Sequence, residues 1–181
     1  MAFTLKSLFR KDDDGPAVRA AYGAIVEQAR KPVFYGAVGV PDTPMGRFAM
    51  VSLHAFLAMD RLGREPGARK FSQDLFDLMF ADMDRNMREL GVGDLSVGKK
   101  VKGLAQNFYA MAADCREGMK GDDDALAAPL RQYVYRDCEP AQGAIDALTA
   151  YMRASIALLA EQNAAEIVEG RIAFAQPPGE N

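Results

Sequence analysis

The side chains best suited to catalysis are few in this chain. It has one histidine, His54, and two cysteines, Cys115 and Cys138. The spacing allows an acid–base pair of His54 with Asp42 or Asp60, but no serine, cysteine or second histidine stands at a recognisable spacing to complete a catalytic set. A hydrogen-bonded core residue on an apolar helix is the favoured interpretation of His54. We therefore expect a protein that is not an enzyme.

The cysteines are too few and too widely spaced for a disulfide framework or a zinc knuckle. Cys115 falls on an apolar helical stripe, which predicts an unreactive core thiol, and Cys138 stands in a predicted loop before Pro140. We expect no metal site and no cofactor. Because no secretory signal and no apolar run of membrane-spanning length is visible, the sequence predicts a soluble cytoplasmic protein with reduced thiols.

The segment from Gly93 to Lys99 fits the pattern G-x-x-x-x-G-K of a phosphate-binding loop. Such a loop also needs a serine or threonine at the next position and a β-strand before it. Position 100 is a lysine, and the preceding segment has a helical pattern. A helix stop followed by a turn explains the glycines better than a nucleotide site does.

Basic side chains are concentrated in residues 85–102, although the whole chain has a net charge of −3. This segment contains two acidic residues, Glu89 and Asp94, and five basic ones, which gives it a local net charge of +3. The basic residues are Arg85, Arg88, Lys99, Lys100 and Lys102. The lysines fall in the first turns of a predicted helix, where the helix dipole disfavours each cation by ~0.3–1 kcal/mol. Two interpretations stay open: a solvated face, or a surface for an anionic partner such as lipid headgroups, RNA or an acidic protein.

A helix–turn–helix reader of DNA is disfavoured, because both helices around this turn are predicted to exceed 20 residues and no short recognition helix is evident. We expect no DNA partner. Residues 1–11 combine four large apolar and three basic side chains, a composition that suits an anionic membrane surface. A frayed terminus with incidental apolar residues is the favoured alternative.

Hydrophobic periodicity predicts helices to position these residues, over 16–31, 44–64, 67–90, 97–119, 123–136 and from 140 to about 169. Thr43 and Ser96 are the expected N-caps of the second and fourth helices. The helix at 44–64 is apolar on nearly every side and is expected at the centre, with Arg47, His54 and Arg61 on one stripe. We predict an all-α, single-domain bundle of about six helices with a long ordered loop between helices one and two. The expected divisions are an N-terminal segment 1–15, a helical domain 16–175 and a disordered tail 176–181.

Two stretches carry a resemblance to a known family. The first is Val40-Pro41-Asp42-Thr43-Pro44, then Gly46-Arg47-Phe48, Leu53-His54, Leu57 and Arg61-Leu62. The second is Phe76-Asp77, residues 82–94 (DMDRNMRELGVGD), Val97, Lys99-Lys100, Lys102 and Phe108-Tyr109. Together they span about residues 22–115, and they resemble the ubiquinol–cytochrome c chaperone family.

The resemblance implies an all-helical, non-catalytic assembly factor for the cytochrome bc complex (complex III). It implies binding of newly made cytochrome b at the cytoplasmic membrane surface, near the ribosome exit tunnel, with a partner assembly subunit. We expect the helices at 44–64, 67–90 and 97–119 to form an apolar groove for a client helix. Residues 85–102 and the N-terminal segment would contact lipid headgroups or ribosomal RNA. The alternative is a helical module that binds a lipid or another small apolar ligand.

The candidate binding residues follow from the two stretches and the basic segment. Asp42, Arg47 and Arg61 are expected at a polar rim, where arginine makes paired contacts with carboxylates. The full set is Asp42, Arg47, His54, Arg61, Arg85, Arg88, Asp94, Lys99, Lys100 and Lys102.

Overall fold

The computed structural model describes residues 15–179, except for the side chains of Asp94 and Leu95. Over this range the protein is helical and contains no strand, so the all-α class is confirmed. Six helices match the predicted ones: α1 (Pro16–Ala29), α3 (Pro44–Leu62), α4 (Arg69–Glu89), α5 (Asp94–Gly118), α6 (Asp123–Tyr133) and α7 (Gln142–Glu161). Two short helices raise the number in the described range to eight: α2 (Pro32–Tyr35) and α8 (Ala164–Val168).

The differences from the predicted elements have local causes. The expected loop at 32–41 begins with α2, where Pro32 occupies a favoured first-turn position and Phe34 is fully buried. The last helix does not continue to residue 169, because the Asn163 side chain accepts a bond from the Ala165 amide and starts α8 separately. Ser96 is not an N-cap; α5 begins at Asp94, and the Ser96 hydroxyl donates to the Gly93 carbonyl.

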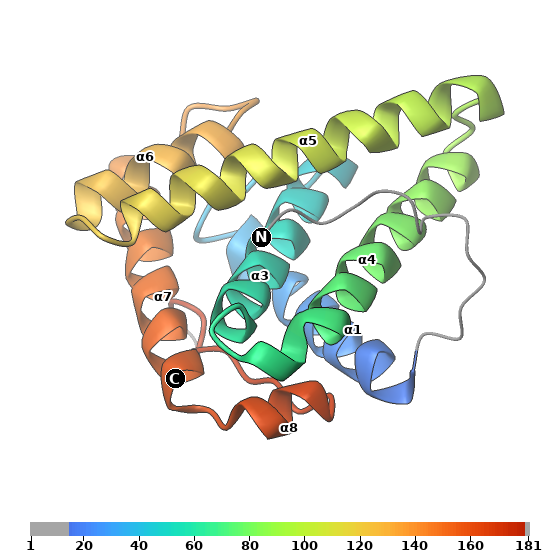
Figure 1. Cartoon of the computed structure of the whole chain (residues 1–181). Helices are drawn as coiled ribbons and strands as arrows, with labels where there is room; N and C mark the ends of the chain where they lie inside the picture. Colours follow the sequence, from blue (N-terminus) through green and yellow to red (C-terminus); the bar gives the residue numbers. More distant parts are fainter. Residues whose placement is uncertain (1–14, 180–181) are drawn as a thin grey trace.

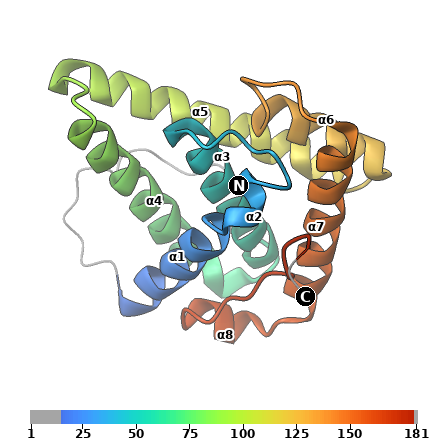
Figure 2. The ribbon, with the colours of Figure 1, turned by 180° about the vertical axis from the view of Figure 1, so that it is seen from behind.

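Helix α3 lies at the centre of the bundle, with α1, α4, α5 and α7 arranged around it (Figures 1 and 2). The Thr43 hydroxyl caps its start by accepting a bond of 3.0 Å from the Gly46 amide, as predicted. Thirteen of its nineteen residues are buried. A helix that is apolar nearly all round can satisfy its side chains only in this position.

Helices α4 and α5 meet at a tight turn and diverge from it, so that α5 spans one side of the molecule and reaches α6 (Figure 1). Gly91 makes the turn with a φ of 81°, a left-handed conformation that favours glycine. The far end of α5 approaches α6 closely at Gly118, where a Cβ atom would lie 2.6 Å from the Ala125 carbonyl oxygen.

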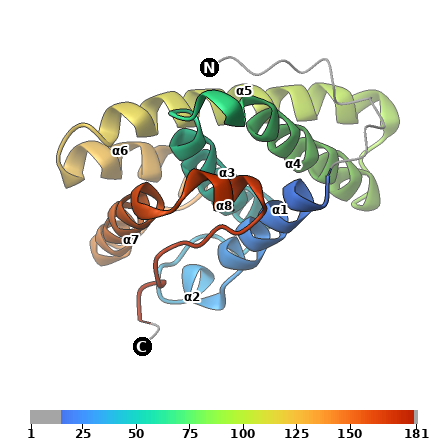
Figure 3. The same ribbon diagram turned by 60° about the horizontal axis from the view of Figure 1, so that its bottom comes forward.

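The segment after α8 runs back along α1 and α7 (Figure 3). The Ala175 carbonyl accepts a bond of 3.0 Å from Gln28 on α1, and the Ala175 amide donates to Ser155 on α7. The tail predicted as disordered begins at 176; within it the structure describes residues 176–179 and buries Pro177. The N-terminal segment proposed as a membrane contact lies outside the described residues, apart from Gly15.

Helix α7 is long and apolar enough to cross a membrane by length and composition alone. A single helix of this kind in the described range is weak evidence for a membrane span, because the core helix of a soluble protein passes the same test. Here α7 contributes Ile145, Leu148 and Met152 to the core, all fully buried. These side chains make α7 one of the helices that build the core of the bundle.

Candidate functional site

A groove of about 960 Å³ lies between the C-terminal half of α5, the end of α3 and α7. Its floor is apolar and well buried, with Phe56 and Met59 from α3 and Phe108 from α5. Partly exposed apolar side chains form its walls: Tyr109, Met119 and Ile156. Such a lining suits an apolar partner rather than a polar substrate.

The aromatic wall of the groove is anchored to α4. The Tyr109 ring stacks on Phe76 at 5.4 Å between centroids, and Phe108 packs edge-on against the same ring at 5.6 Å. Phe80 joins this cluster at 4.6 Å from Phe76. Aromatic pairs at these separations hold each other in defined orientations, so the wall is pre-formed.

A charged cluster borders the groove at the end of α3. The Arg116 guanidinium donates to the Asp60 carboxylate at 2.7 Å and lies over the Phe56 ring, 5.6 Å from its centroid. Arg64 approaches the other Asp60 oxygen at 3.8 Å. With Lys120, these arginines give the rim a net positive charge.

The groove differs in one wall from the predicted one. The helices at 44–64 and 97–119 contribute as expected, but the third wall comes from Ile156 on α7 rather than from the helix at 67–90. Neither Ile156 nor the small pair Ala112 and Ala113, which keeps α5 thin along the groove, was predicted from the sequence. The adjacent alanines were the available signal; no local pattern indicates that α7 lies opposite them.

Two of the predicted rim residues, Asp42 and Arg47, lie together at the start of α3, away from this groove. Arg47 Nε donates to Asp42 Oδ1 at 2.6 Å, and the guanidinium lies over the Tyr35 ring at 5.7 Å. This bond lowers the pKa of the Asp42 carboxyl, while burial raises the pKa of Tyr35 to about 12. Both charged side chains are about half exposed and accessible to a partner.

His54 is fully buried and hydrogen-bonded at both ring nitrogens. The sequence favoured this role as a core residue. Its Nδ1 lies 2.7 Å from the Met50 carbonyl oxygen, and its Nε2 lies 2.7 Å from the Tyr151 hydroxyl. Because a carbonyl can only accept, Nδ1 carries the proton and Nε2 accepts from Tyr151. Desolvation lowers the pKa of His54 to about 4. Without a rearrangement this side chain contacts no partner.

Arg61 joins α3 to the end of α7. Its Nε donates to the Leu159 carbonyl at 2.9 Å, and its Nη2 donates to the Gln162 carbonyl at 3.0 Å. Its Nη1 pairs with Glu65 at 2.7 Å, and only 14% of the Arg61 side chain is exposed. The guanidinium thus satisfies carbonyls that a helix end leaves unpaired, which is a structural role.

The predicted basic residues divide into two groups. Arg88 pairs with Asp84 at 2.6 Å, and Arg85 approaches Asp82 at 3.7 Å, so α4 neutralises its own cations. By contrast, the three lysines of α5 are exposed and make no hydrogen bond or ion pair within the described part of the chain: Lys99, Lys100 and Lys102. The side chain of Asp94 is not among the described ones.

At the α4–α5 turn that precedes these lysines in the chain, Leu90 exposes 66% of its surface. The unpaired lysines and this apolar residue make the turn a candidate contact surface, which we term the lysine face (Leu90, Lys99, Lys100 and Lys102). Among residues 15–179, no three His, Cys, Asp or Glu side chains are grouped to hold a metal ion.

Comparison with known families gives one match over most of the chain. The sequence profile described as "Ubiquinol-cytochrome C chaperone" matches residues 36–174. The match extends beyond the resemblance visible by motif, which ended near residue 115, and includes α6, α7 and α8.

Similar curated proteins carry the name ubiquinol-cytochrome c reductase complex assembly factor 1. The protein of Mus musculus is 27% identical over 171 residues, covering 93% of this chain and 57% of that protein. The Homo sapiens protein is 26% identical over 170 residues, covering 93% and 56%. The Xenopus laevis protein is 24% identical, covering 88% and 80%. The chain thus spans little more than half the length of the mouse and human relatives.

Among solved structures, the crystal structure of the Cbp3 homolog from Brucella abortus is similar to this one. The TM-score is 0.79 with 36% sequence identity, over 88% of this chain and 89% of that chain. The arrangement of the helices around α3 is therefore shared with an experimentally determined protein.

Proposed function

This chain belongs to the ubiquinol-cytochrome C chaperone family, and on that premise we propose that it is a non-catalytic assembly factor for complex III. Its client is newly made cytochrome b, which it binds at the cytoplasmic surface of the membrane. The groove between α3, α5 and α7 receives an apolar helical segment of this client. The lysine face holds the chaperone against an anionic partner.

The groove is the observation that carries the proposal. A helix about 10 Å wide that rises 1.5 Å per residue occupies roughly 120 Å³ per residue. The volume of about 960 Å³ therefore holds about two turns of a client helix. The buried aromatic floor supplies apolar contact area, and the Arg64–Asp60–Arg116 cluster offers charge where the segment leaves the groove. This is helix-in-groove recognition.

Deleting the gene in the source organism tests the function as a whole. We expect lower cytochrome b and complex III activity, with the other respiratory complexes largely unaffected. Normal cytochrome b in the deletion strain would contradict the proposal.

Complementation of that strain tests the groove. Ala113 is exposed and lines the groove, so Ala113→Trp fills it without disturbing the core. Ala110, three residues earlier on α5, is also exposed but is absent from the lining, so Ala110→Trp is the matched control. We expect the control to restore cytochrome b and the groove variant to fail while remaining folded by circular dichroism. Equal rescue by both variants would place the client elsewhere.

The lysine face is tested by reversing the charges of Lys99, Lys100 and Lys102 to glutamate. Cosedimentation with vesicles containing phosphatidylglycerol, and separately with purified ribosomes, identifies the anionic partner. We expect binding to weaken with the variant and with added salt, because contacts between exposed charges are screened. Vesicles of phosphatidylcholine alone are the control. Equal binding by the variant at every salt concentration would leave the lysines as a solvated face.

A further inference from the structure

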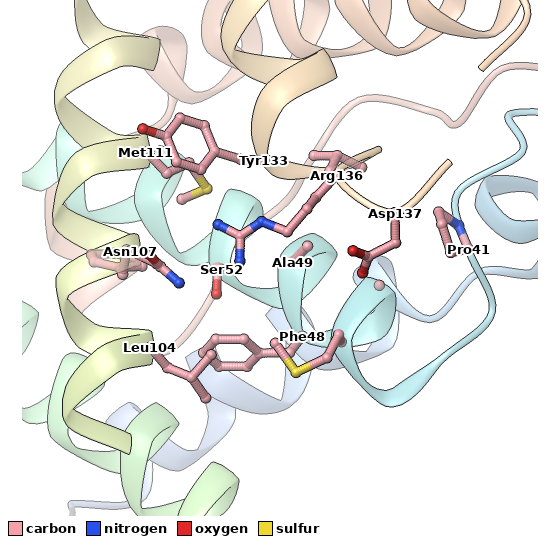
Figure 4. Close-up of a pocket in the computed structure, with 14 residues that line it drawn as sticks. Pro41, Phe48, Ala49, Ser52, Leu104, Asn107, Met111, Tyr133, Arg136 and Asp137 are labelled. Carbon is pink, nitrogen blue, oxygen red and sulfur yellow. The ribbon is translucent and has the colours of Figure 1, made fainter. Parts of the chain in front are cut away.

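A second, smaller cavity lies on another side of α5. It has a volume of about 180 Å³, is open to solvent and is bordered by α3, α5 and the segment that follows α6 (Figure 4). The apolar part of its wall consists of Phe48, Leu104 and Met111, all buried. Phe108 contributes to both this cavity and the groove, but the other lining residues differ. It is a separate site.

Polar side chains converge on the apolar wall from three directions. Ser52 is 97% buried, and its hydroxyl has no hydrogen-bond partner in the structure. Figure 4 shows the Ser52 hydroxyl, the Asn107 amide and the Arg136 guanidinium turned toward one another within the cavity. In the described part of the chain, neither the Asn107 nor the Arg136 side chain makes a hydrogen bond or an ion pair, and both residues are exposed to solvent.

A buried hydroxyl without a partner is unfavourable. Among the unpaired buried hydroxyls of the described residues, that of Ser52 lines this cavity, where an oxygen atom of a ligand would pair it together with the exposed side-chain donors of Asn107 and Arg136. The three groups can all donate to the same oxygen atoms. The guanidinium adds a positive charge and the fork of donors that fits a carboxylate. Asp137 also lines the cavity, and its negative charge opposes a dianion such as phosphate more strongly than a monocarboxylate.

We propose that this cavity binds an apolar monocarboxylate. The carboxylate accepts hydrogen bonds from Arg136, Asn107 and Ser52, and the attached chain or ring packs against Phe48 and Leu104. The volume lies below the roughly 300–1,000 Å³ of pockets for drug-sized ligands. The ligand is therefore a short organic acid or the carboxyl end of a peptide with an apolar last residue. The proposal is independent of the proposed function.

Two methionines line the cavity and report on it directly. Met45 stands at the mouth and Met111 in the wall, so their methyl resonances in ¹³C-methyl-methionine protein serve as probes. Met79 and Met83 line a different pocket and serve as internal controls. Titration with hexanoate should shift the first two resonances saturably, with a millimolar Kd, and leave the controls unchanged. Hexanamide, the neutral isostere, should bind at least tenfold more weakly.

Matched variants test the residues. Arg136→Gln should weaken hexanoate binding at least tenfold, while Arg171→Gln, remote from the cavity, should not change it. Ser52→Ala should weaken binding several-fold without lowering the melting temperature, because it removes an unpaired hydroxyl. Ser72, also buried and unpaired but outside the cavity, provides the control Ser72→Ala.

A pair of acetylated tripeptides ending in leucine, one with a free and one with an amidated terminus, separates the two sources of the carboxylate. Binding of the free form with an affinity above that of hexanoate identifies a chain terminus. Binding of hexanoate alone identifies a small organic acid. The proposal is overturned if neither methyl resonance shifts, if hexanamide binds as well as hexanoate, or if Arg136→Gln binds hexanoate normally.

Discussion

Replacement of His54 by glutamine should remove a pH-dependent part of the protein's stability. Glutamine does not titrate, and its side-chain oxygen can still accept the bond from the Tyr151 hydroxyl that His54 Nε2 accepts in the native protein. The Met50 carbonyl loses the Nδ1 bond but keeps the bond from the backbone amide of residue 54, four residues later in the helix. The variant therefore isolates the effect of protonation.

The magnitude follows from the pKa values of His54 in the folded and unfolded chains. Burial lowers the pKa from 6.5 to about 4. Between these values the unfolded chain binds more protons than the folded one, so the contribution of neutral His54 is complete above pH 6.5 and is lost as the pH falls toward 4. The loss is about 2 kcal/mol between pH 7 and pH 5, and about 3 kcal/mol below pH 4.

Urea unfolding followed by circular dichroism at pH 7, 6 and 5 measures this directly. Other titrating groups are common to both proteins, so the difference in unfolding free energy between wild type and His54→Gln should shrink by about 2 kcal/mol from pH 7 to pH 5. A difference that stays constant over this range would refute the reasoning. Because the chain has a single histidine, its ring resonances provide a second check and should not titrate above about pH 5.

Three further predictions concern single positions. Arg61→Ala should lower the free energy of unfolding by about 3 kcal/mol in urea titrations, because two carbonyls at the end of α7 lose a charged donor. Gly46→Ala should lower the free energy of unfolding by more than about 2 kcal/mol, since its Cβ atom would overlap with the Pro41 carbonyl oxygen. Gly98 lies on α5 with open space around it, so Gly98→Ala should raise the free energy of unfolding by ~0.5–1 kcal/mol. Burial raises the pKa of the Cys115 thiol to about 12, so a thiol reagent at pH 8 should modify one cysteine per native molecule, the exposed Cys138, and two after denaturation.

The boundaries of helices were predictable where a nearby side chain pairs the free backbone groups of a helix end, or where a proline fixes the backbone there. Thr43 and Pro44 start α3 as expected because a hydroxyl cap and a fixed φ act within one turn. The predicted cap at Ser96 failed because three residues before it Gly93, in an extended conformation, already allows the helix to begin. Asn163, the N-cap of α8, is a local sign of the break before this helix. The helical periodicity of the sequence continues across the junction and hides it.

The candidate site was less predictable, because grooves and cavities depend on which faces meet. The apolar circumference of α3 indicates that it is covered, but not that α7 forms one wall of the groove. Ser52 shows why the cavity could not be predicted from the sequence. A serine on a core helix is unremarkable by sequence, and its role depends on Arg136, 84 positions later, turning toward it (Figure 4).

The C-terminal segment gives the fold a late closing step during synthesis. Gly170 lies against α1 so closely that a Cβ atom would stand 2.7 Å from the Ala17 carbonyl oxygen, and Phe174 packs edge-on against His54. Helix α1 can pack on α3 and α4 as soon as these are made, but its contact with Gly170 forms only after about 150 further residues are translated, and contacts between residues so far apart in the chain form slowly. Until then α3 lacks part of its cover. For that interval the growing chain itself exposes part of an apolar helix.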